Sequence, residues 1–303
     1  MTVLLGLEAA EHSGGDDGAL RLAAGLAGAE GSPVVVTTVV PLDPPQATAS
    51  RLDREYRQWR AALTATRHAE ALTALRRAGV EDVRAAVVPA SSVPAGLVES
   101  AHRYGARLIV LGAATEAPAG RFAPGSVAEP LLHSSPVPLA LAPRAWSAPA
   151  EPTGLTCTWA DAARSSDALS ATRALAGRWG VPIRLATFVP ERAALLPSET
   201  GLPLEHVVSE EWAGQVQGSL DDVVADWSGP WPAPETVQGR GAGWAGAVAA
   251  VPWLPGDVLV LGSSRLGPEG RVFLGSTATK ILRAATVPVL VVPRGEGGAP
   301  PST

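Results

Sequence analysis

Two glycine-rich segments hold the residues whose types and spacing best suit the binding of an anion. Gly112 and Gly125 bound the first segment, and Gly262 and Gly275 bound the second at the same separation. A serine follows the last glycine of each, at the predicted start of a helix. Glycines let a backbone approach a ligand closely, and free N–H groups at a helix start attract phosphate oxygens. The segments therefore predict two phosphate sites.

The two serines also have a purely structural interpretation. A serine just before a helix can accept a hydrogen bond from a backbone N–H of the first turn. Ser126 with Glu129 three residues later matches the capping-box pattern. From the residues alone, Ser126 and Ser276 are either ligand donors or helix caps.

Short apolar runs alternate with helical patterns and must position both segments. In the first half we expect strands at 3–7, 34–40, 83–88, 108–111 and 137–141, and helices at 17–27, 50–78, 93–104 and 127–133. Apolar strands that alternate with helices predict an open parallel sheet covered on both faces. Ligands bind such sheets beyond the carboxyl ends of the strands, where both glycine segments fall.

The second half of the chain repeats the first. Residues 108–144 align on 258–294 without a gap, with 14 of 37 pairs identical, and 33–41 align on 182–190. The fold class is therefore α/β, with two tandem doubly wound, Rossmann-like domains. The 303 residues suffice for two domains that each bury their own core. We place the first domain at 1–145, a proline-rich linker at 146–153, the second domain at 154–294 and a disordered tail at 295–303.

Aromatic residues mark the long helices and the end of the second half. Leu52, Tyr56, Trp59 and Leu63 share one helix face, as do Val208, Trp212, Val216, Leu220, Val223 and Trp227, and we interpret both stripes as core. Trp231, Trp244 and Trp253 surround a glycine-rich segment at 239–243, which we predict to be a turn at the pocket rim. These tryptophans could stack an adenine ring, but filling the layer between helices and sheet is the favoured role.

Composition narrows the possible functions. The net charge is -5 and no stretch is strongly basic, which argues against a nucleic-acid binder. The single cysteine, Cys157, excludes an internal disulfide, and the five histidines show no metal-ligand spacing. The first residues meet Glu8 too early for a signal peptide, and no apolar run approaches the roughly 20 residues of a membrane span. We therefore expect a cytoplasmic protein without a metal site.

No nucleophile with its base can be assembled from the spacing, so we expect no enzyme. One segment offers an alternative: Ser13-Gly-Gly-Asp-Asp17 is similar to the loop of ATP pyrophosphatases, which share this architecture. That loop follows the first strand directly, whereas five residues intervene here, and Gly18 stands where its closing serine belongs. A glycine-rich turn that leads into a helix explains the segment equally well.

The chain resembles the universal stress protein family across nearly all of residues 1–294. The nucleotide-binding branch of that family carries Gly-x2-Gly-x9-Gly-Ser/Thr after its fourth strand, then a helix and a strand similar to Val-Pro-Val-Leu-Val-Val. This sequence keeps the outer glycines, the serines and Val287-Pro-Val-Leu-Val-Val292. Thr115 and Arg265 replace the middle glycines. The resemblance implies an adenine nucleotide α-hydrolase-like fold, a non-catalytic role in stress response or signalling, and ATP as a ligand.

The resemblance also implies which residues would hold the nucleotide. ATP-binding members have an acid at the end of the first strand, near the ribose. Glu8 stands there in the first half, whereas the second half offers only Asp161, in the following loop. The candidate set is Glu8, Gly112, Gly120, Gly125 and Ser126 in the first half, and Gly262, Arg265, Gly270, Arg271, Gly275, Ser276 and Thr277 in the second.

The two candidate sites depart from the family pattern in opposite ways. Glu116 and Glu129 put negative charge near the phosphates of the first site, which opposes triphosphate binding. Arg265, Arg271 and Lys280 put positive charge at the second. The second half is therefore the better phosphate site.

The last strand of each half is bounded by prolines, which is typical of a sheet edge. In the family this strand mediates domain pairing, so the resemblance implies that the two halves pair as a pseudo-dimer within one chain.

Three functions stay open. The first is a nucleotide-binding stress module, and the second is a nucleotide-free partner-binding scaffold with degenerate pockets, which the missing middle glycines favour. The third is a pyrophosphatase-like enzyme that uses Ser13–Asp17.

Overall fold

The computed structural model describes residues 2–8, 16–42, 51–147, 151–191, 204–228 and 232–295. In the first half, every strand boundary lies within two residues of the prediction. The elements are β1 (Thr2–Gly6), α1 (Asp16–Glu30), β2 (Val34–Pro41), α2 (Arg51–Arg77), β3 (Val83–Ala90), α3 (Val93–Arg103), β4 (Ala106–Gly112), α4 (Ala128–Leu131) and β5 (Leu139–Ala142).

The second half follows the same order, with one difference at its last helix. Its elements are β6 (Gly154–Thr158), α5 (Ala162–Trp179), β7 (Ile183–Glu191), α6 (Leu204–Ala225), β8 (Glu235–Ala242), α7 (Gly243–Ala249), β9 (Asp257–Gly262), α8 (Ser276–Ala284) and β10 (Val289–Val292). Helix α8 has nine residues, whereas its counterpart α4 has four. The duplicated sequence thus yields a duplicated fold whose helix after the glycine segment is longer in the second half.

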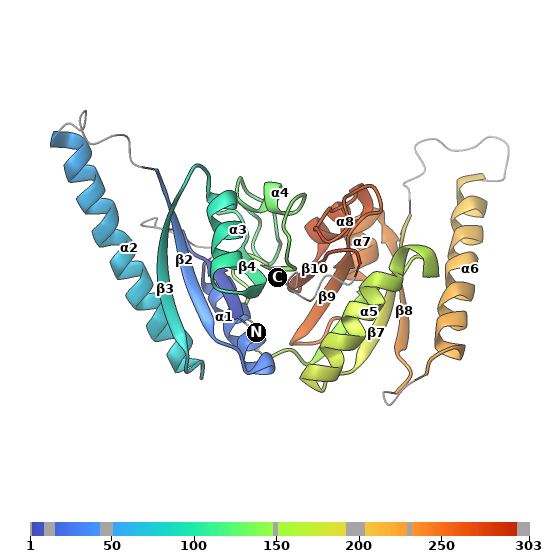
Figure 1. Cartoon of the computed structure of the whole chain (residues 1–303). Coiled ribbons are helices and arrows are strands. Elements are labelled where there is room, and N and C mark those ends of the chain that lie inside the picture. Colours follow the sequence, from blue (N-terminus) through green and yellow to red (C-terminus); the bar gives the residue numbers. More distant parts are fainter. Residues whose placement is uncertain are drawn as a thin grey trace.

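The ten strands form one continuous sheet in the order β3-β2-β1-β4-β5-β10-β9-β6-β7-β8 (Figure 1). Neighbouring strands within each half run parallel, as their apolar sequences predict. At the centre, β5 and β10 pair antiparallel, with Leu141 opposite Val289 and Leu139 opposite Val291. Each last strand is the edge of its own half, and the two edges pair with each other within the chain.

The apolar core divides by sheet face and not by half. One cluster lies between the sheet and helices α1, α2, α5 and α6, and the other between the sheet and helices α3, α4, α7 and α8. Each cluster contains residues of both halves. The two halves therefore share both clusters, because the pairing of β5 with β10 makes each face of the sheet continuous.

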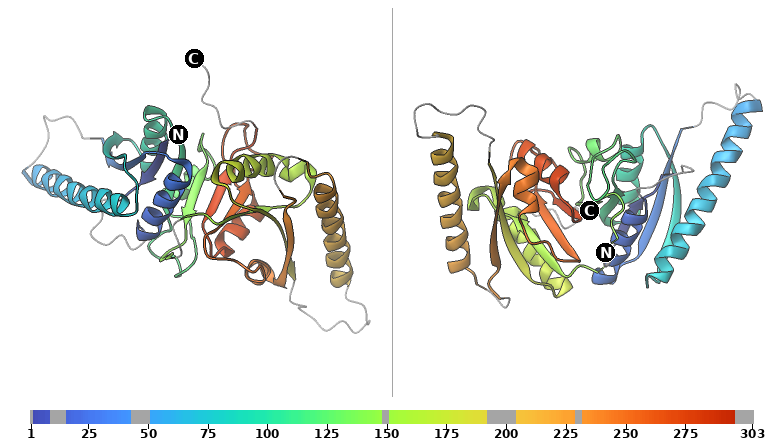
Figure 2. Two further views of the ribbon diagram at one scale, coloured as in Figure 1. Left: turned by 90° about the horizontal axis from the view of Figure 1, so that it is seen from below. Right: turned by 180° about the vertical axis from the view of Figure 1, so that it is seen from behind.

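Helices α1 and α5 also join the halves through a polar contact. The Glu30 carboxylate, whose side chain is only 5% exposed, accepts a hydrogen bond from Trp179 Nε1 at 2.7 Å. Arg178 Nε donates to the same carboxylate at 3.1 Å. In both halves these helices lie next to the central strands, whereas α2 and α6 form the outer ends of the molecule (Figure 2).

The predicted core stripe on α2 is exposed. Leu52, Tyr56 and Trp59 are 74%, 55% and 48% exposed, and Leu63 is only partly buried. The helix instead packs on the sheet through a different face of its second half, which includes Leu75. The prediction was wrong because the first turns of α2 reach beyond the sheet, where nothing in the described part of the chain covers them (Figure 1).

The stripe on α6 is core wherever the structure describes it. Val216 and Leu220 are buried, and Val223 and Trp227 pack against the cluster on that face. The side chains of Val208 and Trp212 lie outside the described residues. The same kind of pattern thus has different outcomes in the two halves.

The glycine-rich segment at 239–243 is not the predicted turn, because residues 239–242 belong to β8 and Gly243 begins α7. A Cβ atom on Gly239 would collide with the carbonyl oxygen of Ala247, and one on Gly241 would collide with the backbone of Gly246. The glycines therefore let α7 lie directly against β8. Trp244 and Trp253 pack against the cluster on this face, which agrees with the favoured role, and Trp231 lies outside the described residues.

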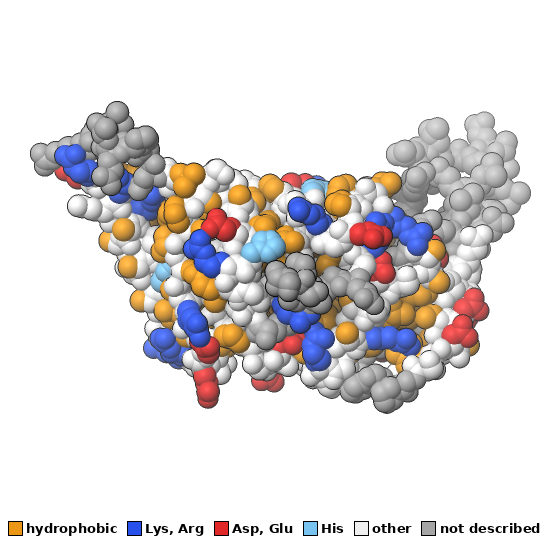
Figure 3. All heavy atoms as spheres, in the orientation of Figure 1, with side chains coloured by type: hydrophobic (Ala, Val, Ile, Leu, Met, Phe, Trp, Pro, Cys, Tyr) orange, Lys and Arg blue, Asp and Glu red, His pale blue; other side chains and the backbone are white. Residues whose placement is uncertain are grey.

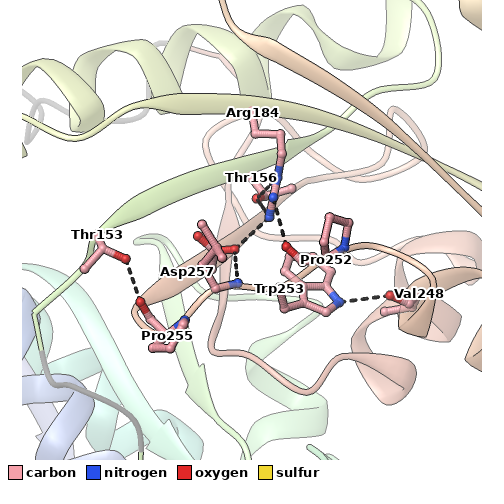
Figure 4. Close-up of polar contacts among 9 residues, drawn as sticks. Thr153, Thr156, Arg184, Val248, Pro252, Trp253, Pro255 and Asp257 are labelled. Carbon is pink, nitrogen blue, oxygen red and sulfur yellow. Dashed lines mark hydrogen bonds and ion pairs between the residues drawn. The ribbon is translucent and has the colours of Figure 1, made fainter.

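A buried polar network holds the loop before β9 (Figure 4). Arg184 of β7 pairs with Asp257 at 2.7 Å, and its guanidinium also donates to Thr156 Oγ1 at 3.1 Å and to the Pro252 carbonyl at 3.1 Å. Asp257 accepts a further hydrogen bond from the Leu254 N–H at 2.8 Å. Because Arg184 and Asp257 are 8% and 5% exposed, their charges are shielded from water. The network fixes the path of residues 252–257.

We predict that Asp257→Asn lowers the free energy of unfolding by about 2 kcal/mol, because the amide keeps the shape but removes the charge from a buried charged hydrogen bond. Urea unfolding followed by circular dichroism measures the change. The matched control is Asp82→Asn, since Asp82 pairs with Arg84 at 3.1 Å on the surface. The control should unfold at the wild-type urea concentration. Equal effects of the two changes would contradict a special role for the buried pair.

Acidic and basic side chains are interspersed on the face of the molecule that Figure 3 shows. Among the described helices, none is both long enough and apolar enough to span a bilayer.

Candidate functional site

The two glycine segments fold into the same loop. In the first half, the Ala114 N–H donates to the Ala123 carbonyl at 3.0 Å. In the second half, the equivalent bond runs from the Ser264 N–H to the Phe273 carbonyl at 2.8 Å. Gly112 and Gly262 are the last residues of β4 and β9, so both loops leave the carboxyl ends of their strands, as predicted.

Gly120 and Gly270 shape the middle of these loops. Their φ angles are +71° and +69°, in the left-handed region that glycine adopts without strain. Their N–H groups donate to the Arg144 carbonyl at 2.8 Å and the Arg294 carbonyl at 3.0 Å. Both N–H groups are therefore engaged by a carbonyl that follows the last strand of their half, and the contacts of these two predicted ligands favour a conformational role.

The side chains of Arg144 and Arg294 hold the two glycine loops. Neither arginine is in the candidate site that was predicted from the sequence. Arg144 Nη1 donates to the Ala117 carbonyl at 2.9 Å, and Arg294 Nη2 donates to the Gly267 carbonyl at 3.2 Å. Arg144 and Arg294 form one of the 14 identical pairs of the repeat, which was the signal that could have found them. Duplication alone did not reveal that their partners are loop carbonyls.

The last glycine of each segment lies at a close approach. A Cβ on Gly125 would lie 3.3 Å from the Cβ of Ala114, and one on Gly275 would lie 3.2 Å from the Cβ of Ser264. Glycine at these positions therefore lets the loop start and the helix start pack against each other.

The two helix starts begin alike, because the Glu129 N–H donates to the Gly125 carbonyl at 3.0 Å as Thr279 does to Gly275, but the helices differ in length. Gly275 is the N-cap of α8, and the first intrahelical N–H in its N-terminal turn is that of Thr279, which donates to the Gly275 carbonyl at 2.9 Å. The N–H groups of Ser276 and Thr277 precede it and have no acceptor within a helix, and both residues are exposed. In the first half, α4 is a single turn with Val127 as its N-cap.

The capping interpretation of the two serines is wrong. Neither α4 nor α8 has a hydrogen bond from a side-chain cap, and Ser126 lies in a turn before the N-cap Val127. Ser276 is already the first residue of its helix, one position past the cap. Both hydroxyl groups are exposed and available to a ligand.

Arg271 contacts the other half of the molecule. Its Nη1 atom lies 3.5 Å from the Ser134 carbonyl at the end of α4. The equivalent residue in the first half, Arg121, donates to the Ala284 carbonyl at the end of α8. The two arginines thus form a symmetric pair of contacts across the junction. The sequence suggested that Arg271 faces a phosphate, whereas in the structure it contacts a carbonyl of the other half.

Arg265 and Lys280 keep exposed side chains in the second half. Arg265 lies in the loop, where its carbonyl accepts a hydrogen bond from Arg294 Nη1 at 2.9 Å. The Lys280 ammonium lies 6.0 Å from the centre of the Trp244 ring, toward α7. In the first half, Glu116 and Glu129 are exposed, so the predicted difference in charge between the two loops is present at the surface.

At the end of β1, Glu8 is exposed beside a buried hydrogen-bond chain. Thr38 Oγ1 donates to the Leu7 carbonyl at 3.0 Å and lies 2.9 Å from His68 Nε2. Because a hydroxyl has one proton to donate, the histidine Nε2–H is the donor in the second bond. Burial lowers the pKa of His68 and so favours its neutral form. The two threonines inside the apolar run at 34–40 were the signal for this missed chain.

In the second half, a tryptophan takes the position of Leu7. Trp159 is 5% exposed, its carbonyl accepts a hydrogen bond from Thr187 Oγ1 at 2.7 Å, and its Nε1 donates to Ser219 Oγ at 3.0 Å. Asp161 is partly exposed in the following loop, and its carbonyl accepts the N–H of Ser165 at 3.0 Å. The second half therefore has a buried indole where the first strand ends, with its acid two residues further along.

The family model of the universal stress protein family matches residues 2–143 and 161–293. The chain belongs to this family. It is 36% identical over 306 residues to a universal stress protein of Mycobacterium tuberculosis (strain ATCC 25618 / H37Rv), across 97% of this chain and 100% of that protein, and to one of Mycobacterium bovis to the same extent.

Solved structures of low sequence identity share the fold of this universal stress protein. A universal stress protein from Archaeoglobus fulgidus superposes with a TM-score of 0.63 at 17% identity, across 97% of this chain and 98% of that one. A protein from Pseudomonas aeruginosa UCBPP-PA14, described as a putative universal stress protein, gives a TM-score of 0.53 at 16% identity, across 96% and 92%. The tandem architecture is thus a known form of the fold.

Family membership also locates the departures from the nucleotide-binding pattern. Thr115 and Arg265 take the positions of the middle glycine, and both are exposed in their loops. Neither side chain is folded into the core, so the two substitutions alter the surface of the loop and not its packing.

Other sequence signals contribute little to the site. Cys157 is fully buried, and burial raises its pKa to about 12, so the thiol stays protonated and inert, as expected. The described residues contain no group of three or more histidine, cysteine or acidic side chains that could hold a metal ion. Ser13 to Gly15 of the pyrophosphatase-like segment lie outside the described residues, and Asp17 is exposed in the first turn of α1.

Proposed function

We propose that this universal stress protein is a non-catalytic stress-response module that binds an adenine nucleotide, with ATP as the first candidate, in its second half. The observation that carries the proposal is the start of α8. Gly275 brings the loop to a helix whose first N–H groups and exposed Ser276 and Thr277 hydroxyls can contact phosphate oxygens.

The topology supports a nucleotide at this place. Strand β6 lies between β9 and β7, so the chain order reverses beside β6, and open α/β sheets bind ligands at the carboxyl ends of strands next to such a reversal. The loop at Gly262 leaves β9 at this point, and a Cβ on Gly262 would lie 3.0 Å from the Cβ of Ala168 in α5. The glycine loop and the first turn of α8 therefore lie at the carboxyl ends of the strands beside this reversal.

Charge favours the second half over the first. The exposed guanidinium of Arg265 provides positive charge on the loop of the second half, where Thr115 is neutral in the first. Exposed Glu116 and Glu129 add negative charge to the first half, and α4 offers a single helical turn. Glu8 would contact a ribose there, but the phosphate end opposes a triphosphate. We assign the first half the weaker site.

A second function, a partner-binding scaffold without nucleotide, is favoured by the same loops. Their middle glycines are replaced, and the N–H groups of Gly120 and Gly270 are engaged by the Arg144 and Arg294 carbonyls. A chain that uses both loops only to hold its halves together would need neither a free phosphate site nor an acid at the ribose.

Calorimetric titration of ATP into the full chain separates the two functions. We expect saturable binding of one ATP per chain, because exposed Arg265 favours a triphosphate in the second half while exposed Glu116 and Glu129 oppose it in the first. Titrations with GTP and with inorganic triphosphate show whether the base or only the phosphates are recognised. The absence of heat at millimolar ATP would rule out the nucleotide proposal and leave the scaffold.

A further inference from the structure

The exposed stripe on α2 forms one continuous apolar surface. Leu52, Tyr56, Trp59 and Leu63 follow one another at intervals of four, three and four residues, which is the spacing of a helix that pairs with another helix. The Tyr56 and Trp59 rings contact each other with centroids 5.7 Å apart, and the Arg60 guanidinium lies 5.7 Å from the centre of the Tyr56 ring. The patch is therefore formed within the isolated chain.

This stripe is separate from the face by which α2 packs on its own sheet. Thr64 and His68 are buried toward the sheet, and at 100° per residue they lie roughly a third of a turn around the helix from the stripe. Below Leu63 the same outer face carries the ion pair of Arg67 and Glu70, at 3.0 Å, which ends the apolar surface. The stripe thus covers only the turns that project beyond the sheet (Figures 1 and 2).

We propose that this stripe pairs, antiparallel, with the same stripe of a second copy of the chain. A two-fold axis between Arg57 and Gln58 then places Leu52 of one copy against Leu63 of the other. The same register places Tyr56 against Trp59, so that each aromatic side chain meets its partner at the centre of the contact. The four layers follow directly from the spacing of the stripe.

The charges beside the stripe fit this orientation. Asp53 and Arg60 lie on the same flank, one turn on either side of the centre, with Asp53 exposed and Arg60 partly exposed. The antiparallel register brings Asp53 of one copy next to Arg60 of the other, twice across the axis. Exposed ion pairs add little affinity, so these pairs select the orientation while the apolar layers stabilise it.

The position of α2 in the molecule also favours the antiparallel arrangement. The second half of the helix packs on its own sheet, and its first half projects past the strands at the outer end of the molecule (Figure 1). An antiparallel pair places the two sheets at opposite ends of the contact, whereas a parallel pair brings both sheets to the same end. Stable interfaces bury about 1,200–2,000 Å² in total, and a contact of about three turns of one helix pair is smaller than that. We therefore expect a reversible dimer.

Sedimentation of the full chain over a range of concentrations tests the proposal. The wild type should dimerise at micromolar concentrations, and Trp59→Glu should raise the dissociation constant at least about tenfold, because each dimer then buries two charges in its central layers. The matched control is Ala61→Glu, which places the same charge at an exposed position on the opposite side of the same turns. It should dimerise like the wild type, and circular dichroism of both variants checks that α2 is intact.

A charge exchange tests the orientation. Asp53→Arg and Arg60→Asp should each weaken the dimer, and the double variant should recover it, since the two cross-contacts are then reversed but complementary. A double variant as weak as the single ones would overturn the antiparallel register. A wild type that stays monomeric at 100 micromolar, roughly the limit at which so small an interface would still form, would overturn the dimer. Cosedimentation of that monomer with anionic phosphatidylserine vesicles, lost in Trp59→Glu, would assign the stripe to a membrane surface and equally overturn it.

Discussion

Replacing Gly275 with valine is expected to weaken ATP binding at least about a hundredfold, or about 2.7 kcal/mol. Already the Cβ of the new side chain would lie 3.2 Å from the Cβ of Ser264 and 3.4 Å from its Oγ, which is closer than an ordinary van der Waals contact. The helix start must then move away from the loop, and the N–H groups of Ser276 and Thr277 lose their alignment on a phosphate. Each charged hydrogen bond lost costs about 1.5–3 kcal/mol. Calorimetry measures the loss.

Gly125→Val is the matched control for this experiment. Its Cβ would lie 3.3 Å from the Cβ of Ala114, so the local disturbance is nearly the same in the first half. We expect ATP affinity to stay at the wild-type value, because the proposed site is in the second half. Loss of binding in Gly125→Val alone would assign the nucleotide to the first half. Equal losses in both would show that the valines act through the shared fold.

Leu290→Ala is expected to lower the free energy of unfolding by about 3 kcal/mol and to loosen both halves together. Leu290 is 2% exposed and lies opposite Ala140 in the central strand pair. Removing a buried leucine side chain costs about 2–5 kcal/mol, because contacts are lost and a cavity remains. Since the cluster that contains Leu290 also contains residues of β1 and α1, the first half should lose protection as well. Hydrogen exchange read separately on β4 and β9 measures both effects.

The control for the central strand is Leu254→Ala, the same change at a leucine that is 60% exposed in the same half. Its effect on stability should be at most about 0.5 kcal/mol. Faster exchange confined to the second half in Leu290→Ala would contradict the continuous core. It would show that the halves unfold as separate units despite their shared sheet.

Much of the fold could be predicted because the relevant patterns are local. The apolar runs at 3–7 and 34–40 have strand character whatever surrounds them, and the 150-residue offset shows the duplication without any structure. The resemblance then supplied the pairing of the last strands, which local patterns could not. Where the prediction failed, as for Tyr56 and Trp59, the pattern was correct for a helix but did not say whether a surface would cover it.

The candidate site was predictable to the level of its loops but not of its contacts. Gly125 and Gly275 stand out by duplication, and the structure shows that each allows a close approach. Arg271 looked like a phosphate ligand because it lies in the right loop, yet its guanidinium reaches the Ser134 carbonyl of the other half. A sequence records which residues occupy a loop, but the direction of a long side chain depends on what the opposite half offers it.

The sequence alone determined that this chain is a duplicated α/β protein with glycine loops at the carboxyl ends of its fourth strands, since propensity, periodicity and repetition act along the chain. Tertiary structure decided that the two halves share their cores, that α8 is longer than α4, and that the stripe on α2 faces water. The reason is that burial and hydrogen bonding depend on pairs of surfaces. The position of the second surface is set by other segments of the chain, which the local pattern does not record.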